Sequence, residues 1–377
     1  MSDPSGGVIP AFWIAFGASA IAAYPIFRLL LALKSRQTVS QFAPEGHQVK
    51  QGTPTMGGLI ILIGIVSALV VIPTWALRSF GVPVVPVGTP SRGGDFESWG
   101  QIHGFQAVAT LLLVLAFAAI GFIDDFLVPR LIKGKRGLGW KQKILMQVLA
   151  ALLAVPAVGL GWSAAGVGAT VFVVLFFSNA YNFADGLDAL AGTLGVLLFG
   201  GLGVLSYIAG GIDVPICAAM VGAFLPFLFL NAPPAKVFMG DVGSLPIGAL
   251  LGLEVVRLFT PAGRLALQAA DSAPYALAWP VLTAFAIFSF VMLAEIAPPP
   301  LQVFWVKVFK RKLFPFTPIH HAFEKAGWRE TRVVFVFGLV QALCVALAIT
   351  LICYLERPER PRIWSFNGGY FESSVDR

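Results

Sequence analysis

Charged side chains are scarce in this sequence. Asp, Glu, Lys and Arg make up 12% of the 377 residues, whereas hydrophobic residues make up 57%. Soluble globular domains carry about 25% charged residues, so this chain lacks the charge needed to keep its surface in water. The deficit excludes a water-soluble enzyme and a disordered chain. It predicts that most of the molecular surface faces lipid.

Cysteine and histidine are also rare. The three cysteines, Cys217, Cys344 and Cys353, lie in apolar stretches without the spacing of a disulfide framework or a zinc site. We expect them to be small core residues. The first ten residues contain no Lys or Arg, which is not typical of a cleaved signal peptide, so the first apolar segment is expected to remain as a span.

Long apolar runs dominate what is present. A helix needs about 20 apolar residues to cross a bilayer, and residues 144–184 contain no charged residue, which is enough for two crossings around a turn at 159–163. The other expected spans are 10–33, 56–77, 104–123, 189–211, 214–231, 242–260, 275–297 and 333–355. The chain is therefore predicted to be an all-α polytopic membrane protein, a single domain over 1–377 with about ten transmembrane helices.

Lys and Arg residues gather in the loops after the first, third, seventh and ninth expected helices. Because basic loops stay in the cytoplasm, both termini are predicted outside. The net charge of +7 could suggest a nucleic-acid partner. Because the basic residues lie in loops along one membrane surface, we exclude nucleic acid as a partner. Residues 298–332 are expected to form an interfacial or cytoplasmic segment, in which 302–312 is a short basic and aromatic helix at the membrane surface.

Five of the acidic residues lie at span ends that this orientation places on the cytoplasmic side. Asp124 and Asp125 close the third helix, Asp185 and Asp188 open the sixth, and Asp241 opens the eighth. Each could simply cap a helix or pair with a loop lysine. Adjacent carboxylates repel unless a cation lies between them, and Mg²⁺ beside phosphate is the usual solution. The convergence of three acidic segments on the cytoplasmic side therefore favours a site there for a metal ion and a phosphate group.

Two further polar segments flank these acids. His320 and His321 could bind zinc with Glu324, contact an anion or nucleotide, or be plain surface histidines. The segment Thr53-Pro-Thr-Met-Gly-Gly58 enters the second helix and taken alone indicates close helix packing only.

Together these motifs resemble a known family. The motifs are Thr53-Pro-Thr-Met-Gly-Gly58, Asp124-Asp125, Asn179-x-x-Asn182-x-x-Asp185-Gly-Leu-Asp188, Asn231 with Phe238-Met-Gly-Asp241-x-Gly-Ser, and His320-His321-x-Phe-Glu324. They are similar to those of the polyprenyl-phosphate N-acetylhexosamine-1-phosphate transferases. Within that superfamily they resemble the bacterial phospho-N-acetylmuramoyl-pentapeptide transferase (translocase I) branch, and they run in the family's order over most of the chain.

The resemblance implies a reaction in peptidoglycan synthesis at the bacterial cytoplasmic (inner) membrane. UDP-MurNAc-pentapeptide and undecaprenyl phosphate would give lipid I and UMP, with Mg²⁺ as cofactor, in an enzyme expected to form a homodimer. The resemblance implies Asp241 as the metal ligand, and Asp124, Asp125, His320 and His321 as further catalytic residues. The implied substrate-binding residues are Lys50, Thr55, Asn179, Asn182, Phe183, Asp185, Gly186, Asp188, Asn231, Phe238 and Gln302.

This chain departs from the family pattern at two notable positions. Ala322 replaces a third histidine, and Val128 replaces a lysine that commonly follows the acidic pair. Lys133, Lys135 and Lys141 are the candidates for supplying the missing charge. Two alternatives remain at this point: a GlcNAc-1-phosphate transferase of the same superfamily, and a secondary transporter, which also has many spans and polar residues within the membrane.

Overall fold

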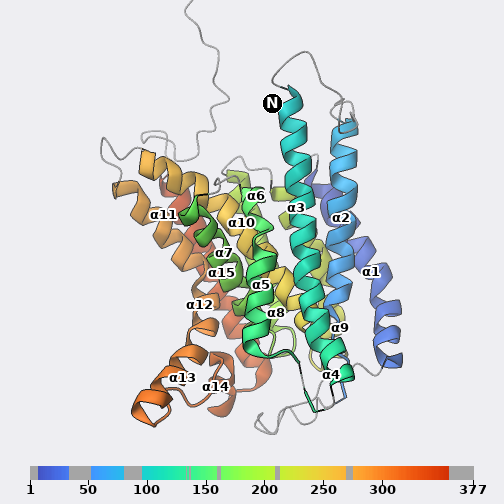
Figure 1. The fold of residues 1–377 in the computed structure, drawn as a ribbon, viewed down its shortest axis with the longest axis vertical. Coiled ribbons are helices and arrows are strands. Elements are labelled where there is room, and N and C mark those ends of the chain that lie inside the picture. Colours follow the sequence, from blue (N-terminus) through green and yellow to red (C-terminus); the bar gives the residue numbers. More distant parts are fainter. Residues whose placement is uncertain are drawn as a thin grey trace, which may run out of the picture.

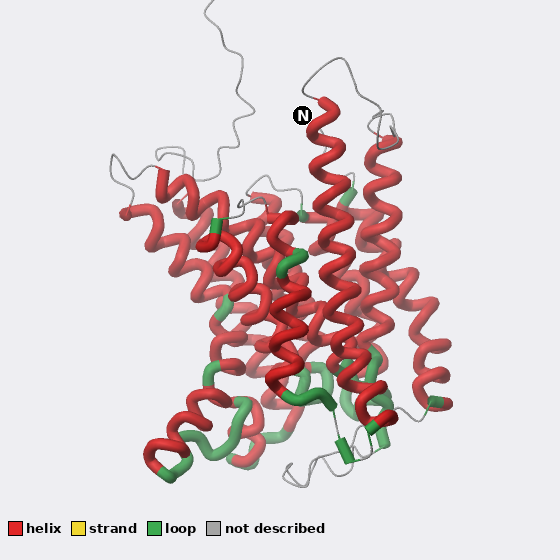
Figure 2. The backbone as a smooth tube through the Cα atoms, viewed as in Figure 1, coloured by secondary structure: helices red, strands yellow, loops and turns green. Residues whose placement is uncertain are grey.

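The computed structural model describes residues 7–33, 52–79, 96–132, 134–135, 137–158, 163–208, 213–268 and 275–355. Over these ranges the chain forms helices joined by loops, with no β-strand (Figure 2). The helices are α1 (Val8–Ala32), α2 (Gly58–Ser79), α3 (Phe96–Phe122), the π-helical turn η2 (Ile123–Leu127), α4 (Val128–Leu131), α5 (Trp140–Ala151), α6 (Ala154–Val158), α7 (Ala164–Ala184), α8 (Leu190–Ile208), α9 (Val214–Asn231), α10 (Asp241–Gln268), α11 (Tyr275–Phe288), α12 (Phe290–Ile296), α13 (Pro298–Phe309), α14 (Ile319–Lys325) and α15 (Glu330–Leu355).

Helices cover every one of the ten expected spans. Eight described helical stretches are long and apolar enough to cross a membrane, and the bent run of α11, α12 and α13 makes a ninth if it counts as one span. The apolar part of α2, Gly58–Val71, is shorter. The all-α polytopic fold class is confirmed. The expected turn at 159–163 lies outside the described residues except for Ser163, which caps α7 by accepting a hydrogen bond from the N–H of Gly166 at 3.1 Å.

The helix α10 forms the centre of the bundle. It packs against α3 and α7 on two sides and also contacts α2, α8 and α11 (Figure 1). Its first five turns, from Asp241 to Phe259, are almost wholly buried. A helix that is apolar on all sides belongs inside a bundle, so α10 carries its N-terminal Asp241 into the interior of one end of the molecule.

Helices α2 and α10 approach each other through glycines. A Cβ on Gly58 would collide with the backbone of Gly243, and a Cβ on Gly243 would collide with Gly58. Small residues allow such backbone contact between membrane helices. The packing interpretation of the segment 53–58 is therefore confirmed, and the contact lies one turn from Asp241.

We expect Gly58→Ala to destabilise the protein because the added methyl group has no space. Overpacking of this kind costs about 1–3 kcal/mol. The control is Gly168→Ala on α7, where nothing lies within 4 Å of the added carbon and where alanine favours the helix. Thermal unfolding in detergent should show a lower midpoint for the first variant alone. Equal midpoints would contradict the close contact.

The third expected span does not end at the acidic pair, which corrects the sequence prediction. The chain continues helically from α3 through η2 and α4 to Leu131, so Asp124 and Asp125 lie in a π-helical turn inside a helical stretch. A π-turn adds one residue to a helical turn, is rare, and often occurs at functional sites. It changes the direction of the side chains that follow.

Two further findings concern Arg257 and the cysteines, and the second corrects the expectation that all three cysteines are core residues. Arg257 lies within α10, where its guanidinium binds Glu254 at 2.8 Å, Thr110 at 2.7 Å and Asp213 at 3.4 Å. A buried arginine with these partners connects α3, α9 and α10 at the end of the bundle opposite Asp241. Among the cysteines only Cys217 is a core residue, since Cys344 is half-buried and Cys353 exposed.

Candidate active site

Three carboxylates meet at the buried start of α10. Asp124 and Asp125 come from η2 and Asp241 is the first residue of α10; one oxygen from each lies within 4.8 Å of the others. Gly121 allows this approach, because a Cβ there would collide with the backbone of Asp241. The predicted gathering of acids from distant segments is confirmed for this trio.

Lys143 on α5 supplies the positive charge between two of these acids. Its ammonium lies 3.3 Å from Asp124 Oδ2 and also contacts Asp241 Oδ2. The backbone N–H of Leu138 donates to Asp124 Oδ1 at 2.6 Å. Of the three lysines proposed from sequence, Lys135 and Lys141 are exposed and do not have this position, and Lys133 lies outside the described residues.

Asn182 on α7 holds the other side of Asp241. Its amide nitrogen donates to Asp241 Oδ1 at 2.7 Å and to Ser244 Oγ at 2.8 Å. One turn earlier on α7, Asn179 donates to Gln147 Oε1 at 2.9 Å and to the carbonyl of Leu175 at 2.8 Å. The two asparagines share one face of α7, as their spacing predicted, but only Asn182 contacts the acidic trio.

The start of α10 and the loop before it bind two more carboxylate oxygens. The N–H of Val242 donates to Asp125 Oδ2 at 3.1 Å, and the N–H of Gly240 donates to Asp185 Oδ2 at 3.0 Å. Gly240 has a φ of +71°, a conformation that favours glycine.

Burial raises the pKa of Asp185 well above its usual range, and nearby Asp241 and Asp125 add to the rise, while the N–H of Gly240 opposes it. Asp185 follows the last residue of α7 and lies in the turn before α8, which agrees with its expected place just ahead of the span 189–211.

The donor set fits a hard divalent cation. Three carboxylates supply oxygen ligands of the kind that Mg²⁺ and similar ions prefer, and the trio lies in a half-buried position. Lys143 and Asn182 use only some of the carboxylate oxygens, so the arrangement can concentrate positive charge where a phosphate would bind. The cluster is therefore chemically suited to phosphate transfer chemistry.

The segments 53–58 and 237–240 pair along their backbones. The N–H of Phe238 donates to the carbonyl of Pro54 at 2.9 Å, and the N–H of Gly57 donates to the carbonyl of Phe238 at 2.7 Å. This pairing brings Thr55 next to Gly240, where a Cβ on the glycine would meet the threonine hydroxyl. Thr55 and Phe238 thus lie beside the loop that binds Asp185.

Two of the expected substrate-binding residues hold the fold of neighbouring loops. The amide of Asn231 accepts from the N–H of Ala189 at 2.9 Å and donates to the carbonyl of Val237 at 2.8 Å. Asp188 Oδ2 accepts from the N–H of Ala235 at 2.9 Å. Both side chains are 3% exposed, so their contacts fix the turn after α7 against the loop before α10.

The two histidines differ sharply in environment. His320 on α14 is fully buried, and its Nδ1 lies 2.9 Å from Oε2 of Glu295, which is also fully buried on α12. Its Nε2 has no hydrogen-bond partner among the described residues and lies against Gly186, where a Cβ would collide with it. His321 is less buried and lies 2.6 Å from Glu324 Oε2. The Glu295–His320 pair therefore connects α12 and α14 to the turn that contains Asp185.

We expect Glu295→Leu to disrupt this connection, because the buried His320 would lose the hydrogen-bond partner that it has among the described residues. Leaving a buried polar group unpaired costs about 1–3 kcal/mol, and His320 would lose its fixed position. Glu295→Gln retains an acceptor and should keep most of the stability. Thermal unfolding of both variants tests this. The expectation fails if the leucine variant is as stable as the glutamine variant.

The remaining expected residues are scattered around this arrangement. Phe183 is half-buried near the end of α7, and Lys50 lies outside the described residues. Gln302 on α13 uses its amide to bind backbone: its Oε1 accepts from the N–H groups of Leu313 at 3.0 Å and Phe314 at 2.9 Å, and its Nε2 donates to the carbonyl of Phe314 at 3.2 Å. Gln302 therefore folds back the chain after α13.

Sequence reasoning missed several residues of this site. Lys143, Gln147, Glu295 and Glu330 were not singled out, although Glu330 Oε1 accepts a 2.6 Å hydrogen bond from the N–H of Asp188. Gln147 and Glu295 are polar residues inside apolar segments, and that signal was available. Lys143 resembled any other basic loop residue, so nothing local distinguished it.

Comparison with known proteins agrees with this geometry. Residues 107–259, which include the acidic trio, match the family described as Glycosyl transferase family 4, and residues 50–62 match phospho-N-acetylmuramoyl-pentapeptide-transferase signature 1.

Whole-length relatives carry the second of these names. The phospho-N-acetylmuramoyl-pentapeptide-transferase of Listeria welshimeri is 32% identical over 90% of this chain and 98% of its own. The proteins of the same name from Geobacillus kaustophilus and Acinetobacter baylyi are 31% and 30% identical, over 92% and 86% of this chain and 98% and 87% of their own. With this coverage and the acidic trio in place, the chain belongs to the phospho-N-acetylmuramoyl-pentapeptide-transferase family.

Proposed function

We propose that this protein transfers phospho-MurNAc-pentapeptide from UDP-MurNAc-pentapeptide to undecaprenyl phosphate, giving lipid I and UMP for peptidoglycan synthesis. The observation that carries the proposal is the meeting of Asp124, Asp125 and Asp241 within 4.8 Å at a buried helix start. A diphosphate substrate needs its negative charge neutralised during transfer, and this cluster with Lys143 is suited to that task. The three carboxylates lie together at one end of the bundle, where α10 begins, which favours this reaction over transport through the bilayer centre.

We assign Mg²⁺ as the cofactor and Asp241 as its principal ligand, with Asp124 and Asp125 completing the acidic pocket. When bound, the ion would neutralise the diphosphate oxygens. His320 and His321 are proposed to lie near the substrate, the first as a positioning residue through Glu295. The proposed substrate-binding residues remain Lys50, Thr55, Asn179, Asn182, Phe183, Asp185, Gly186, Asp188, Asn231, Phe238 and Gln302, with Phe238 stacking on uracil.

The proposed chemistry is one in-line displacement. An oxygen of the lipid phosphate attacks the phosphorus that carries the sugar, a new P–O bond forms, and the P–O bond to UMP breaks. The second pKa of a phosphate monoester is near 6, so the attacking oxygen is already deprotonated at pH 7 and needs mainly orientation by Asp124. Hydrogen bonds and Lys143 already engage both oxygens of Asp124, which favours this role over covalent attack.

Trapping distinguishes this route from a two-step route through an acyl phosphate. The enzyme is incubated with sugar-labelled UDP-MurNAc-pentapeptide without lipid acceptor, and peptides are analysed by mass spectrometry. A single displacement leaves every aspartate unmodified. A sugar-phosphate adduct on any aspartate would defeat it.

We further propose that the site faces the cytoplasm at the bacterial inner membrane, with both termini outside, and that the enzyme works as a homodimer. The basic loops near the site support the orientation. Labelling of single cysteines from each side of inverted vesicles tests the topology, and light scattering of the detergent-solubilised protein tests the dimer.

The decisive activity assay is UMP release in detergent, with undecaprenyl phosphate and Mg²⁺ each present or omitted. We expect release only with both, and only from UDP-MurNAc-pentapeptide. Release from UDP-GlcNAc instead would indicate the GlcNAc-1-phosphate branch. Failure of release with any UDP-sugar would contradict the proposed function.

A further inference from the structure

The helix α13 leaves the bundle at the end that carries the acidic site. The helical stretches Val281–Phe288 and Phe290–Phe309 are bent by 59°, and α13 lies at the lower edge of the molecule (Figure 1). Twelve residues of helix measure about 18 Å, which is too short to cross about 30 Å of hydrocarbon. Its main helical neighbour is α12. Most of the surface of α13 is therefore not covered by the other described helices and is free to contact lipid or water.

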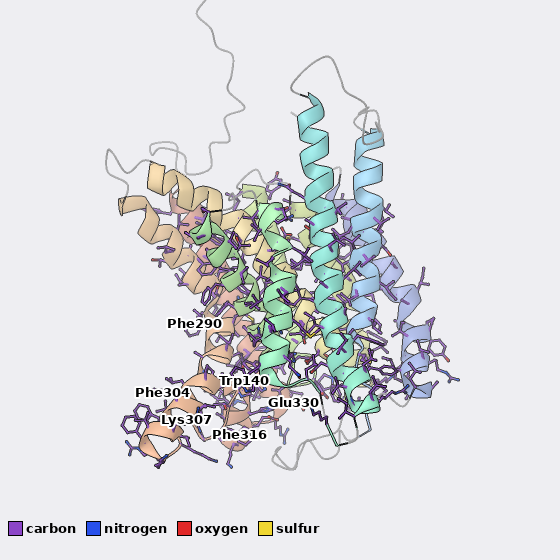
Figure 3. All side chains as sticks on the ribbon, viewed as in Figure 1. Trp140, Phe290, Phe304, Lys307, Phe316 and Glu330 are labelled. Carbon is purple, nitrogen blue, oxygen red and sulfur yellow. The ribbon has the colours of Figure 1, made fainter. Side chains whose placement is uncertain are left out.

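The exposed surface of α13 is apolar on nearly every side. Val303, Phe304 and Val308 are 56%, 59% and 53% exposed, and Figure 3 shows Phe304 and Lys307 at this outer edge. Between Pro298 and Phe309 only Gln302 and Lys307 are polar, and the amide of Gln302 is turned to the backbone of the following loop. A surface helix would present a polar face to water. The sequence-based expectation of a surface helix therefore fits α13 less well than insertion into lipid.

The positive charges of this region lie together at the C-terminal end of α13. Lys307, Lys310, Arg311 and Lys312 are all exposed. The sequence contains no acidic residue between Glu295 and Glu324, so no neighbouring carboxylate in this segment offsets them. An apolar helix that ends in a cluster of cations matches the boundary between hydrocarbon and anionic head groups. A neutral phospholipid surface would accommodate the apolar helix but not this charge.

We propose that α13 inserts obliquely into the leaflet on the side of the acidic site, and that the basic cluster at its end binds anionic phospholipid head groups such as phosphatidylglycerol. The lipid would act as a fixed anchor for the segment between α12 and α14. Since Gln302 ties α13 to the loop that leads to α14, the anchor lies next to the segment that carries His320.

The first experiment measures lipid selectivity of the full-length protein. Purified protein is mixed with equal amounts of phosphatidylglycerol and phosphatidylcholine, and native mass spectrometry counts the bound lipids. We expect Lys310→Gln/Lys312→Gln to lower the preference for phosphatidylglycerol by about tenfold, given the attraction of each basic residue to anionic lipid. The control Lys135→Gln/Lys141→Gln removes the same charge from exposed positions and should retain the preference. Equal losses in both variants, or no preference in the wild type, would overturn the proposal.

The second experiment measures how deeply α13 lies in the membrane. A spin label is placed at Val308→Cys in a protein whose Cys344 and Cys353 are replaced by serine, reconstituted in vesicles that contain phosphatidylglycerol. We expect the label to be reached by oxygen, which dissolves in the hydrocarbon, and protected from a water-soluble nickel complex. A label reached mainly by the nickel complex would place α13 in water. Protection from both reagents would indicate a protein partner on this face. Either result would refute the lipid assignment.

Discussion

Replacing Asp241 with asparagine is expected to reduce Mg²⁺-dependent UMP release by about a thousandfold or more, which is the scale for losing a central electrostatic element of a transition state. Asp241 contacts Lys143 and Asn182, and with Asp124 and Asp125 it forms the cluster that we propose as the cation site. Asparagine has nearly the same shape, so the fold should survive. The initial rate is measured over a range of Mg²⁺ concentrations.

The matched control is Asp213→Asn at the opposite end of the bundle, where the carboxylate lies 3.4 Å from Arg257. This variant is expected to lose some stability but to keep its dependence on Mg²⁺. Thermal unfolding distinguishes a folded, inactive enzyme from an unfolded one. Near-normal activity in folded Asp241→Asn would remove this residue from the metal site.

Lys143→Met should also have a large effect, about a hundredfold loss of UMP release. The substitution removes the only described cation that contacts Asp124 and Asp241, so their carboxylates repel each other more strongly and the diphosphate loses a positive partner. Breaking a buried ion pair by removing one partner is costly in stability as well. Rates and thermal unfolding are measured in parallel.

Lys141→Met is the control for this second prediction because Lys141 lies on the same helix and is exposed. We expect it to keep wild-type activity. If the two variants lose activity equally, a general role of basic charge at this surface would replace the specific role assigned to Lys143. Restored activity in Lys143→Arg would support a requirement for positive charge at that position.

Much of the fold follows directly from the sequence. The scarcity of charge and the lengths of the apolar runs predicted a polytopic helical protein, because a helix satisfies its own backbone hydrogen bonds in lipid. The acids were informative because charges close to lipid are costly unless they have a function. Asp124 and Asp241 were predicted to converge, and their motifs predicted the family.

What the sequence did not reveal depends on contacts between distant residues. Nothing near Lys143 distinguishes it from Lys141, and the packing of α5 against α3 and α7 brings it to the acids. The π-turn at Asp124 has no clear local signature. Gly186 was interpreted as a substrate contact, yet its lack of a side chain accommodates His320, which Glu295 holds from another helix.

The proposed metal site is tested most directly by the binding of Mn²⁺, as a spectroscopic substitute for Mg²⁺, to the full-length protein, measured by electron paramagnetic resonance. We expect one bound ion per chain that Mg²⁺ displaces, lost in Asp241→Asn and retained in Asp213→Asn. Unchanged Mn²⁺ binding by folded Asp241→Asn would show that the three carboxylates at the start of α10 do not form the metal site.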